Sequence, residues 1–136
     1  MKKVIILDDD HTYLSLLQRA IKLEKLENDV RLVNSAPEFR QFMESDFPQI
    51  GLALLDINLG DGENGFDLLA WLQQRFTAPP VPAILQSWTT EPPELERARS
   101  LGSELRPKVK TFADMRQHLR DWLNMANPGA GPRDSS

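Results

Sequence analysis

Cysteine is absent from this chain of 136 residues. Without thiols the protein has no disulfide framework, no thiolate metal site and no cysteine nucleophile. Long apolar runs are missing as well. The run Val4–Leu7 ends at three aspartates, too early for a signal peptide, and no stretch approaches the roughly 20 apolar residues of a membrane span. These absences predict a cytoplasmic protein without a membrane anchor.

An excess of positive charge is also lacking. The chain has 16 Lys and Arg residues against 20 Asp and Glu, a formal net charge of -4, and its basic residues are scattered. This distribution gives no electrostatic footprint for nucleic acid or an anionic membrane, so we expect the domain itself to bind neither. With 40% hydrophobic residues, the chain has enough apolar material for one core and one domain.

Short apolar runs alternate with stretches of helical period, and this alternation indicates βα units wound around a parallel sheet. We expect five such units. The predicted strands are Val4–Leu7, Val30–Val33, Gly51–Leu55, Ala83–Gln86 and a weaker one, Leu105–Val109.

Helix starts are marked twice by a hydroxyl residue followed three positions later by an acidic one, as in a capping box: Ser35 with Glu38, and Thr111 with Asp114. The helix after the two prolines at 92 and 93 has the weakest apolar stripe, so we expect it to be the loosest element. We predict a domain over residues 1–125 and a disordered tail or linker stump over 126–136.

Acidic residues follow two of the predicted strands. Asp8, Asp9 and Asp10 follow the first strand, and Asp56 follows the third. Ligands of open parallel sheets bind at the carboxyl ends of the strands, so these carboxylates should converge if the strands are neighbours. Like charges at such a distance need a cation, and oxygen ligands suit Mg²⁺.

A hydroxyl and an ammonium complete the pattern. Ser87 ends the fourth strand, and the weak fifth strand offers Lys108 or Lys110. Carboxylate nucleophile, metal, hydroxyl and lysine together predict phosphoryl transfer. A single aspartate at a strand end is more often a helix N-cap, but the joint pattern favours the functional interpretation for Asp9 and Asp56.

Residues 2–124 resemble the receiver domain of two-component response regulators, the CheY-like superfamily. The resemblance is carried by Val-Ile-Ile-Leu-Asp-Asp-Asp-His-Thr-Tyr-Leu at the start and by Leu-Ala-Leu-Leu-Asp-Ile-Asn-Leu around Asp56. It implies a flavodoxin-like α/β fold, a doubly wound five-stranded parallel sheet of order 2-1-3-4-5 with five helices. It also implies a phosphorylation-dependent switch, not an enzyme, that is a monomer or a weak dimer.

The resemblance assigns roles to particular residues. Asp56 is the implied phosphoacceptor, and Asp8, Asp9, Asp56 and the backbone carbonyl of Asn58 are the implied Mg²⁺ ligands. The implied phosphoryl-binding residues are Ser87 and Lys108. The implied partners are a sensor histidine kinase or phosphotransfer protein, which supplies the phosphoryl group, and a downstream target protein.

Four positions depart from the family pattern. Gly60 replaces the usual proline of the loop after the acceptor, and Leu105 replaces an aromatic residue. Val109 replaces the proline after the lysine, and Trp88 replaces a small residue. We hypothesise that the Trp88 ring partly covers the acceptor and slows entry of the phosphodonor or of water. The alternative is that Trp88 only packs over its own loop or lies half exposed.

Two other functions fit parts of the sequence. The departures favour a degenerate receiver that binds a protein partner without phosphorylation. The run Asp8-Asp9-Asp10-His11-Thr12 also fits the Asp-x-Asp-x-Thr motif of haloacid-dehalogenase-type phosphatases, with Asp8 as nucleophile. That fold would leave Asp56 unexplained, and the chain is short for it.

Overall fold

Five parallel strands form the centre of the molecule in the computed structural model, which describes residues 1–60, 62–77 and 80–129. The strand order is β2-β1-β3-β4-β5, which confirms the predicted order. The strands are β1 (Lys3–Leu7), β2 (Val30–Val33), β3 (Ile50–Asp56), β4 (Ala83–Ser87) and β5 (Leu105–Pro107).

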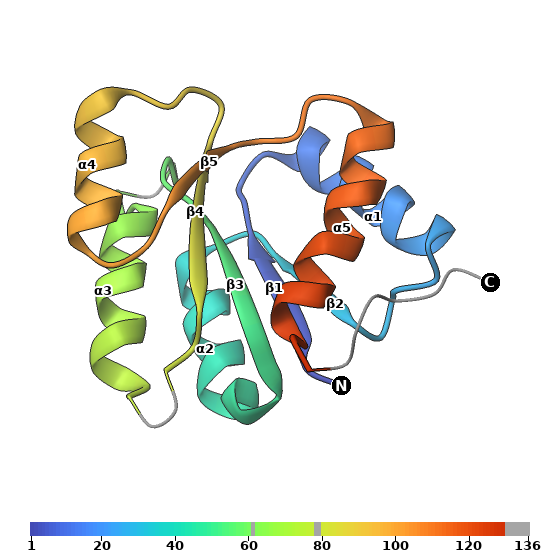
Figure 1. The fold of residues 1–136 in the computed structure, drawn as a ribbon, viewed down its shortest axis with the longest axis horizontal. Coiled ribbons are helices and arrows are strands. Elements are labelled where there is room, and N and C mark those ends of the chain that lie inside the picture. The colour runs from blue at the N-terminus through green and yellow to red at the C-terminus, as the bar shows by residue number, and fades with distance from the viewer. Residues whose placement is uncertain (61, 78–79, 130–136) are drawn as a thin grey trace.

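Helices cover both faces of the sheet (Figure 1). The α-helices of the described residues are α1 (His11–Leu23), α2 (Ala36–Asp46), α3 (Gly65–Arg75), α4 (Pro92–Ser100) and α5 (Phe112–Ala126), and a short 3₁₀ helix, η1 (Phe47–Gln49), follows α2. Helices α1 and α5 lie on one face, and α2, α3 and α4 lie on the other. The doubly wound arrangement predicted from the alternating runs is confirmed.

The side chains of the central strands alternate between two apolar cores. In β1, Ile5 and Leu7 face the core under α2 and α3, whereas Val4 and Ile6 face the core under α1 and α5. All seven residues of β3 are buried. A strand covered by helices on both faces is apolar throughout, which is why these strands read as continuous apolar runs in the sequence.

The predicted helix caps are present at two helix starts. The Ser35 hydroxyl accepts a hydrogen bond from the Glu38 amide at 3.3 Å, and the Thr111 hydroxyl accepts one from the Asp114 amide at 3.1 Å. Of the nine residues of α4, only Ala98 is buried. The helix expected to be loosest therefore contributes least to the core.

The fifth strand is shorter than predicted. It ends at Pro107 instead of Val109: the backbone N–H of Lys108 makes the last hydrogen bond to β4, to the Ser87 carbonyl at 2.8 Å, and the chain then leaves the sheet. Strand β4 extends one residue beyond its predicted end, to Ser87. Ser87 and Lys108 therefore both lie at the carboxyl ends of their strands.

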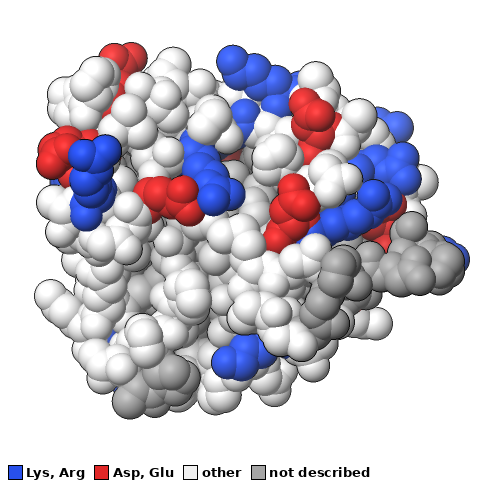
Figure 2. Space-filling view, in the orientation of Figure 1, with Lys and Arg blue, Asp and Glu red and all other residues white. Residues whose placement is uncertain are grey.

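Helix α5 continues through Ala126, one residue past the predicted domain boundary. Ala126 is buried against Gly51, where an added Cβ would lie 2.4 Å from the Ala126 carbonyl oxygen. Asn127 then bonds the backbone of Lys2 in both directions, at 2.6 and 2.9 Å. Residues 130–136 of the predicted tail lie outside the described residues. Across the described part of the chain, no helix is both long and apolar enough to cross a bilayer. On the face drawn in Figure 2, Lys and Arg side chains are interspersed with Asp and Glu side chains.

Candidate functional site

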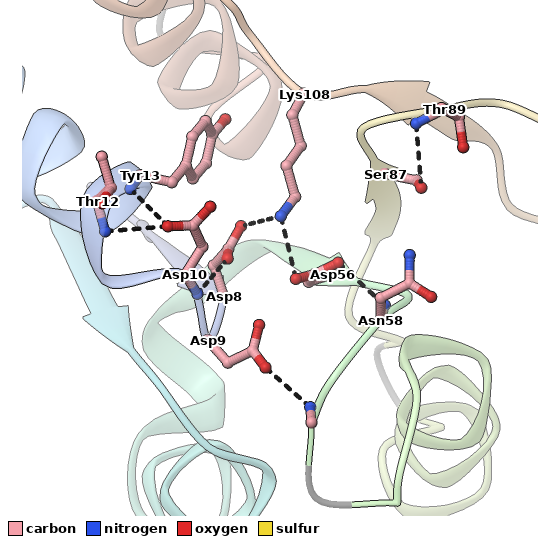
Figure 3. A network of polar contacts seen from close by, with 11 residues as sticks. Asp8, Asp9, Asp10, Thr12, Tyr13, Asp56, Asn58, Ser87, Thr89 and Lys108 are labelled. Carbon is pink, nitrogen blue, oxygen red and sulfur yellow. Dashed lines mark hydrogen bonds and ion pairs between the residues drawn. The ribbon is translucent and has the colours of Figure 1, made fainter.

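The carboxyl ends of β1 and β3 bring three acidic side chains together (Figure 3). Strands β1 and β3 are neighbours, so Asp8 and Asp9 after β1 lie beside Asp56 at the end of β3. One carboxylate oxygen of each residue lies within 4.8 Å of the others. Asp8 and Asp56 are buried, and Asp9 is exposed.

Lys108 reaches into this cluster from the other side. Its Nζ lies 2.8 Å from Oδ2 of Asp8 and 3.1 Å from Oδ2 of Asp56 (Figure 3). The lysine is 4% exposed, so this ammonium is shielded from water. Lys110, the competing candidate, is exposed on the surface. The structure therefore places Lys108, and not Lys110, beside the predicted acceptor.

Backbone amides orient the carboxylates. The Asn58 amide donates to Oδ1 of Asp56 at 3.0 Å, and the Gly60 amide donates to Oδ2 of Asp9 at 2.8 Å. The loop after β3 thus fastens both the predicted acceptor and an acid of β1. Helix α3 begins close behind it, because Gly65 approaches the Asp56 carbonyl so tightly that a Cβ would lie 2.7 Å from its oxygen.

The three consecutive aspartates have different environments. Asp8 accepts a hydrogen bond from the Asp10 amide at 2.9 Å and pairs with Lys108. Asp9 points toward the loop at Gly60. Asp10 is the N-cap of α1, since its Oδ1 accepts hydrogen bonds from the Thr12 and Tyr13 amides at 3.0 and 3.2 Å. The capping interpretation weighed for single aspartates holds for Asp10.

Burial sets the charge state of the cluster. It raises the pKa of Asp56 from 3.8 to about 6, although the Asn58 amide and the Lys108 charge act in the opposite direction. Burial also raises the pKa of Asp8. For Lys108, burial lowers the pKa, but the hydrogen bond and charge of Asp8 and the charge of Asp56 outweigh it and raise the pKa overall.

The donor set fits a hard divalent cation. Three carboxylates and one ammonium leave two negative charges uncompensated when all are ionised. Oxygen donors within 4.8 Å of one another suit Mg²⁺, which commonly takes one or two carboxylates together with water and phosphate oxygens. A cation here would relieve the repulsion between Asp8 and Asp56, a repulsion that raises the pKa of Asp56.

Ser87 lies at the end of β4, the strand that pairs with β3 and its terminal Asp56. It is buried, and its hydroxyl accepts a hydrogen bond from the Thr89 amide at 3.4 Å (Figure 3). Its carbonyl accepts the hydrogen bond from Lys108. The backbone of Ser87 is thus tied to the lysine, while its hydroxyl hydrogen is available as a donor.

Two aromatic rings border Lys108, and one of them was not singled out from the sequence. Nζ of Lys108 lies 5.0 Å from the centre of the Trp88 ring and 5.2 Å from that of Tyr13. Burial raises the pKa of Tyr13 to about 12. Tyr13 stands in the first turn of α1, four positions after Asp9. No local signal in the sequence identifies its contact with Lys108, because that contact joins segments that are far apart in the chain.

Sequence comparison places most of the chain in one family. Residues 4–106 match the model of the response regulator receiver domain. No curated protein matches the chain by sequence.

Solved receiver structures share the fold. A CheY-like receiver domain protein from Methanospirillum hungatei JF-1 superposes with a TM-score of 0.73 at 21% identity, covering 94% of this chain and 98% of that one. The phosphorylated cyanobacterial phytochrome response regulator RcpA gives a TM-score of 0.74 at 18% identity, covering 98% of this chain and all of that one (100%). The Mn²⁺-bound form of response regulator Rcp1 gives 0.69 at 18% identity, with coverages of 97% and 99%.

Fold and site together define a flavodoxin-like α/β domain with a cluster of acidic residues at the carboxyl ends of its strands. The chain belongs to the response regulator receiver family. Receiver domains of this family are signalling switches that are phosphorylated on an aspartate and bind a divalent metal at an acidic pocket. In general they interact with histidine kinases and with downstream effectors.

Proposed function

We propose that Asp56 accepts a phosphoryl group from the phosphohistidine of a sensor histidine kinase or a phosphotransfer protein in a two-component phosphorelay. A carboxylate oxygen of Asp56 attacks phosphorus, the phosphorus–nitrogen bond to imidazole breaks, and an acyl phosphate forms. Water later cleaves this bond and restores the carboxylate. The observation that carries the proposal is the position of Asp56, which ends β3 between the Asn58 amide and the Lys108 ammonium.

A divalent cation belongs to this proposal. Asp8, Asp9, Asp56 and the backbone carbonyl of Asn58 are the residues that we propose hold Mg²⁺. When bound, the cation would supply positive charge that offsets the repulsion between the acceptor carboxylate and the incoming phosphoryl group. Asp9 is the most accessible of the three acids, and one of its carboxylate oxygens lies within 4.8 Å of those of Asp8 and Asp56.

The remaining site residues bind the transferred group. Lys108 lies within hydrogen-bond distance of Asp56 and compensates the charge that the phosphoryl group brings, about -1.5 to -2 at neutral pH. Ser87 donates its hydroxyl hydrogen to a phosphoryl oxygen. Both residues are joined through the backbone at the edge of the sheet, so a shift of one is transmitted to the other.

Helix α4 is the element that we propose responds to this shift. It buries only Ala98. It is attached to α3 by the Gln73 side chain, which donates to the Leu101 carbonyl at 2.6 Å, and by Arg97 stacked over the Phe66 ring at 4.3 Å. Such surface contacts break at lower cost than a core contact, so a downstream protein can read the altered face.

One experiment tests the phosphoacceptor. The protein is incubated with Mg²⁺ and a small acyl phosphate, and the intact mass is measured for wild type, Asp56→Asn and Asp8→Asn. We expect one added phosphoryl group on wild type and none on Asp56→Asn. Label that persists in Asp56→Asn contradicts the assignment. Continuous release of phosphate that needs Asp8 would favour the haloacid-dehalogenase-type phosphatase instead.

A receiver that binds its partner without phosphorylation is the second candidate. It is favoured by the apolar Leu105, which fills the usual aromatic position and is buried in the core, and by the half-covered Trp88 ring. An unlabelled wild type in the same experiment, with its fold intact, supports this candidate. The hypothesis that Trp88 gates the acceptor stays a prediction, and it competes with a second role of this ring, which lies 5.0 Å from the Lys108 ammonium.

A further inference from the structure

The position of the Lys108 ammonium is not fixed by its own backbone. Lys108 follows a strand of three residues, and its N–H makes the last link to β4. Beyond the backbone, a lysine stem has several rotatable bonds and about 2 kcal/mol of rotamer entropy. Nevertheless Nζ lies between two buried carboxylates, at 2.8 Å from Asp8 and 3.1 Å from Asp56. Besides these carboxylates, two aromatic rings contact the ammonium.

Two rings form a corner around this ammonium. The rings of Tyr13 and Trp88 are nearly perpendicular, at 80°, with their centres 5.4 Å apart. Nζ of Lys108 lies 5.2 Å from one ring centre and 5.0 Å from the other. Both distances are within the range in which a cation is attracted to the face of an aromatic ring. The carboxylates thus hold the ammonium on one side and the rings hold it on the other.

The two rings differ in exposure. Tyr13 is 2% exposed and belongs to the core, whereas Trp88 is 44% exposed. An indole held only by burial would be more fully covered. The contacts of Trp88 with the Tyr13 edge and the Lys108 ammonium therefore hold it over the site. A half-exposed ring over a buried charge is also free to move when that charge moves.

We propose that Tyr13 and Trp88 are positioning residues that hold the Lys108 ammonium in place for phosphoryl transfer. This inference rests on the proposed role of Asp56 as phosphoacceptor. When Asp56 carries a phosphoryl group, the ammonium follows the new oxygens and leaves the corner between the rings. Trp88 then loses its cation contact at the surface, beside the start of the loop that leads to α4. The indole is thus the first exposed group to register phosphorylation.

Replacing the Trp88 ring distinguishes a role in positioning Lys108 from simple coverage of the acceptor Asp56. The rate of Asp56 phosphorylation by a small acyl phosphate is measured at saturating Mg²⁺ for wild type, Trp88→Phe and Trp88→Leu. The exposed position makes both variants compatible with folding. Positioning predicts a rate near wild type for the phenylalanine, which keeps an aromatic face. It predicts a rate about 3- to 30-fold lower for the leucine, which corresponds to the loss of one cation–π contact.

If Trp88 instead only covers the acceptor, a smaller side chain should speed phosphorylation. Trp88→Phe and Trp88→Leu would then both be faster than wild type and would behave alike. That outcome overturns the positioning role. Tyr13→Phe serves as the matched variant at the buried ring: it keeps the aromatic face, so its rate should stay near wild type.

A double variant tests whether the effect acts through the lysine. In a Lys108→Met background, Trp88→Leu should cause no further decrease in rate, because no ammonium remains to be positioned. An equal decrease in both backgrounds overturns the inference. This readout distinguishes positioning from a general loss of structure, which would lower the rate in either background.

A measurement without phosphorylation keeps the two proposals apart. Ring currents from Tyr13 and Trp88 should shift the NMR signals of the Lys108 ε-methylene group upfield in the unphosphorylated protein, and Trp88→Leu should reduce this shift. If Trp88→Leu reduces the shift but wild type is never phosphorylated, the ring contact is supported and the phosphoacceptor role of Asp56 is refuted. An unshifted ε-methylene signal of Lys108 in wild type refutes the contact between the lysine and the two rings.

Discussion

Nζ of Lys108 lies 3.1 Å from Oδ2 of Asp56, although 52 positions separate the two residues in the chain. The same nitrogen lies 2.8 Å from Oδ2 of Asp8, so a single ammonium links the ends of β1, β3 and β5. Breaking a buried ion pair by removing one partner leaves the other charge uncompensated, which costs more than the pair contributes when intact.

Lys108→Met should therefore lower both the stability of the folded protein and the rate of phosphorylation. Without a cation opposite Asp8 and Asp56, we expect the free energy of unfolding in EDTA at pH 7.5 to fall by about 3 kcal/mol. The phosphorylation rate should fall about 100-fold, as for the loss of one charge-stabilising donor. Urea denaturation and intact-mass kinetics measure the two effects. The exposed Lys110 provides the matched control, since Lys110→Met should change the unfolding free energy by less than about 0.5 kcal/mol.

The choice between these lysines shows what the sequence alone could predict. The residues alone left Lys108 and Lys110 open and the family resemblance implied Lys108, whose ammonium the structure places at the acidic cluster. The strand containing the lysine was predicted too long, because apolar composition does not show where a chain leaves the sheet. The last hydrogen bond of the strand joins Lys108 to the Ser87 carbonyl, which is a contact between distant segments.

The pKa of Asp56 predicts a dependence of stability on pH. Burial raises it from 3.8 to about 6. Between these values the folded state holds a proton that the unfolded state has released, so the free energy of unfolding falls as pH rises from about 4 to about 6. The Asp56→Asn variant has no carboxyl group to titrate at this position, so it avoids this fall in the free energy of unfolding. In EDTA at pH 7.5 we expect the variant to be about 1–3 kcal/mol more stable than wild type.

The comparison at lower pH provides the control for this prediction. At pH 4.5 most of the wild-type Asp56 is protonated, so the difference between the two proteins should shrink. Urea denaturation at both pH values measures it. A difference that is equal at both, or larger at pH 4.5, contradicts a raised pKa for Asp56.

Mg²⁺ should stabilise the folded protein through the acidic cluster. At a free concentration of 100 times its dissociation constant, a ligand of the native state raises the free energy of unfolding by about 2.7 kcal/mol. We expect a corresponding rise in melting temperature for wild type and a much smaller one for Asp9→Asn. Asp10→Asn should respond as wild type does, because Asp10 faces α1. Equal responses of all three proteins would refute the proposed ligand set.

The cap of α1 can be tested separately from the site. Asp10→Ala removes the acceptor of the Thr12 and Tyr13 amides, so we expect a loss of about 1 kcal/mol. Asp10→Asn keeps an oxygen acceptor and should lose little. The measurement is thermal or urea unfolding, together with the mass assay. A loss of phosphorylation in Asp10→Asn would mean that the carboxylate has a role at the site as well.

Tyr13 shows what remained hidden in the sequence. It is one apolar residue among several in α1, and it is buried there together with Leu17, Ala20 and Ile21. Its contact with Lys108 depends on how α1 is set against β5, across the sheet. A periodic pattern specifies the face of a helix but not which distant side chain that face will meet. The strands and acidic residues were predictable because they are local; the aromatic corner was not.

The division of roles among Asp8, Asp9 and Asp10 has a consequence for how this segment can change over evolutionary time. The tenth position needs only a short side chain with an oxygen acceptor, so serine, threonine and asparagine are equivalent substitutes there. The eighth position must match a buried ammonium and the ninth a loop amide, each with a carboxylate. Three identical neighbours in this sequence should therefore diverge at unequal rates in its descendants, with the third drifting first.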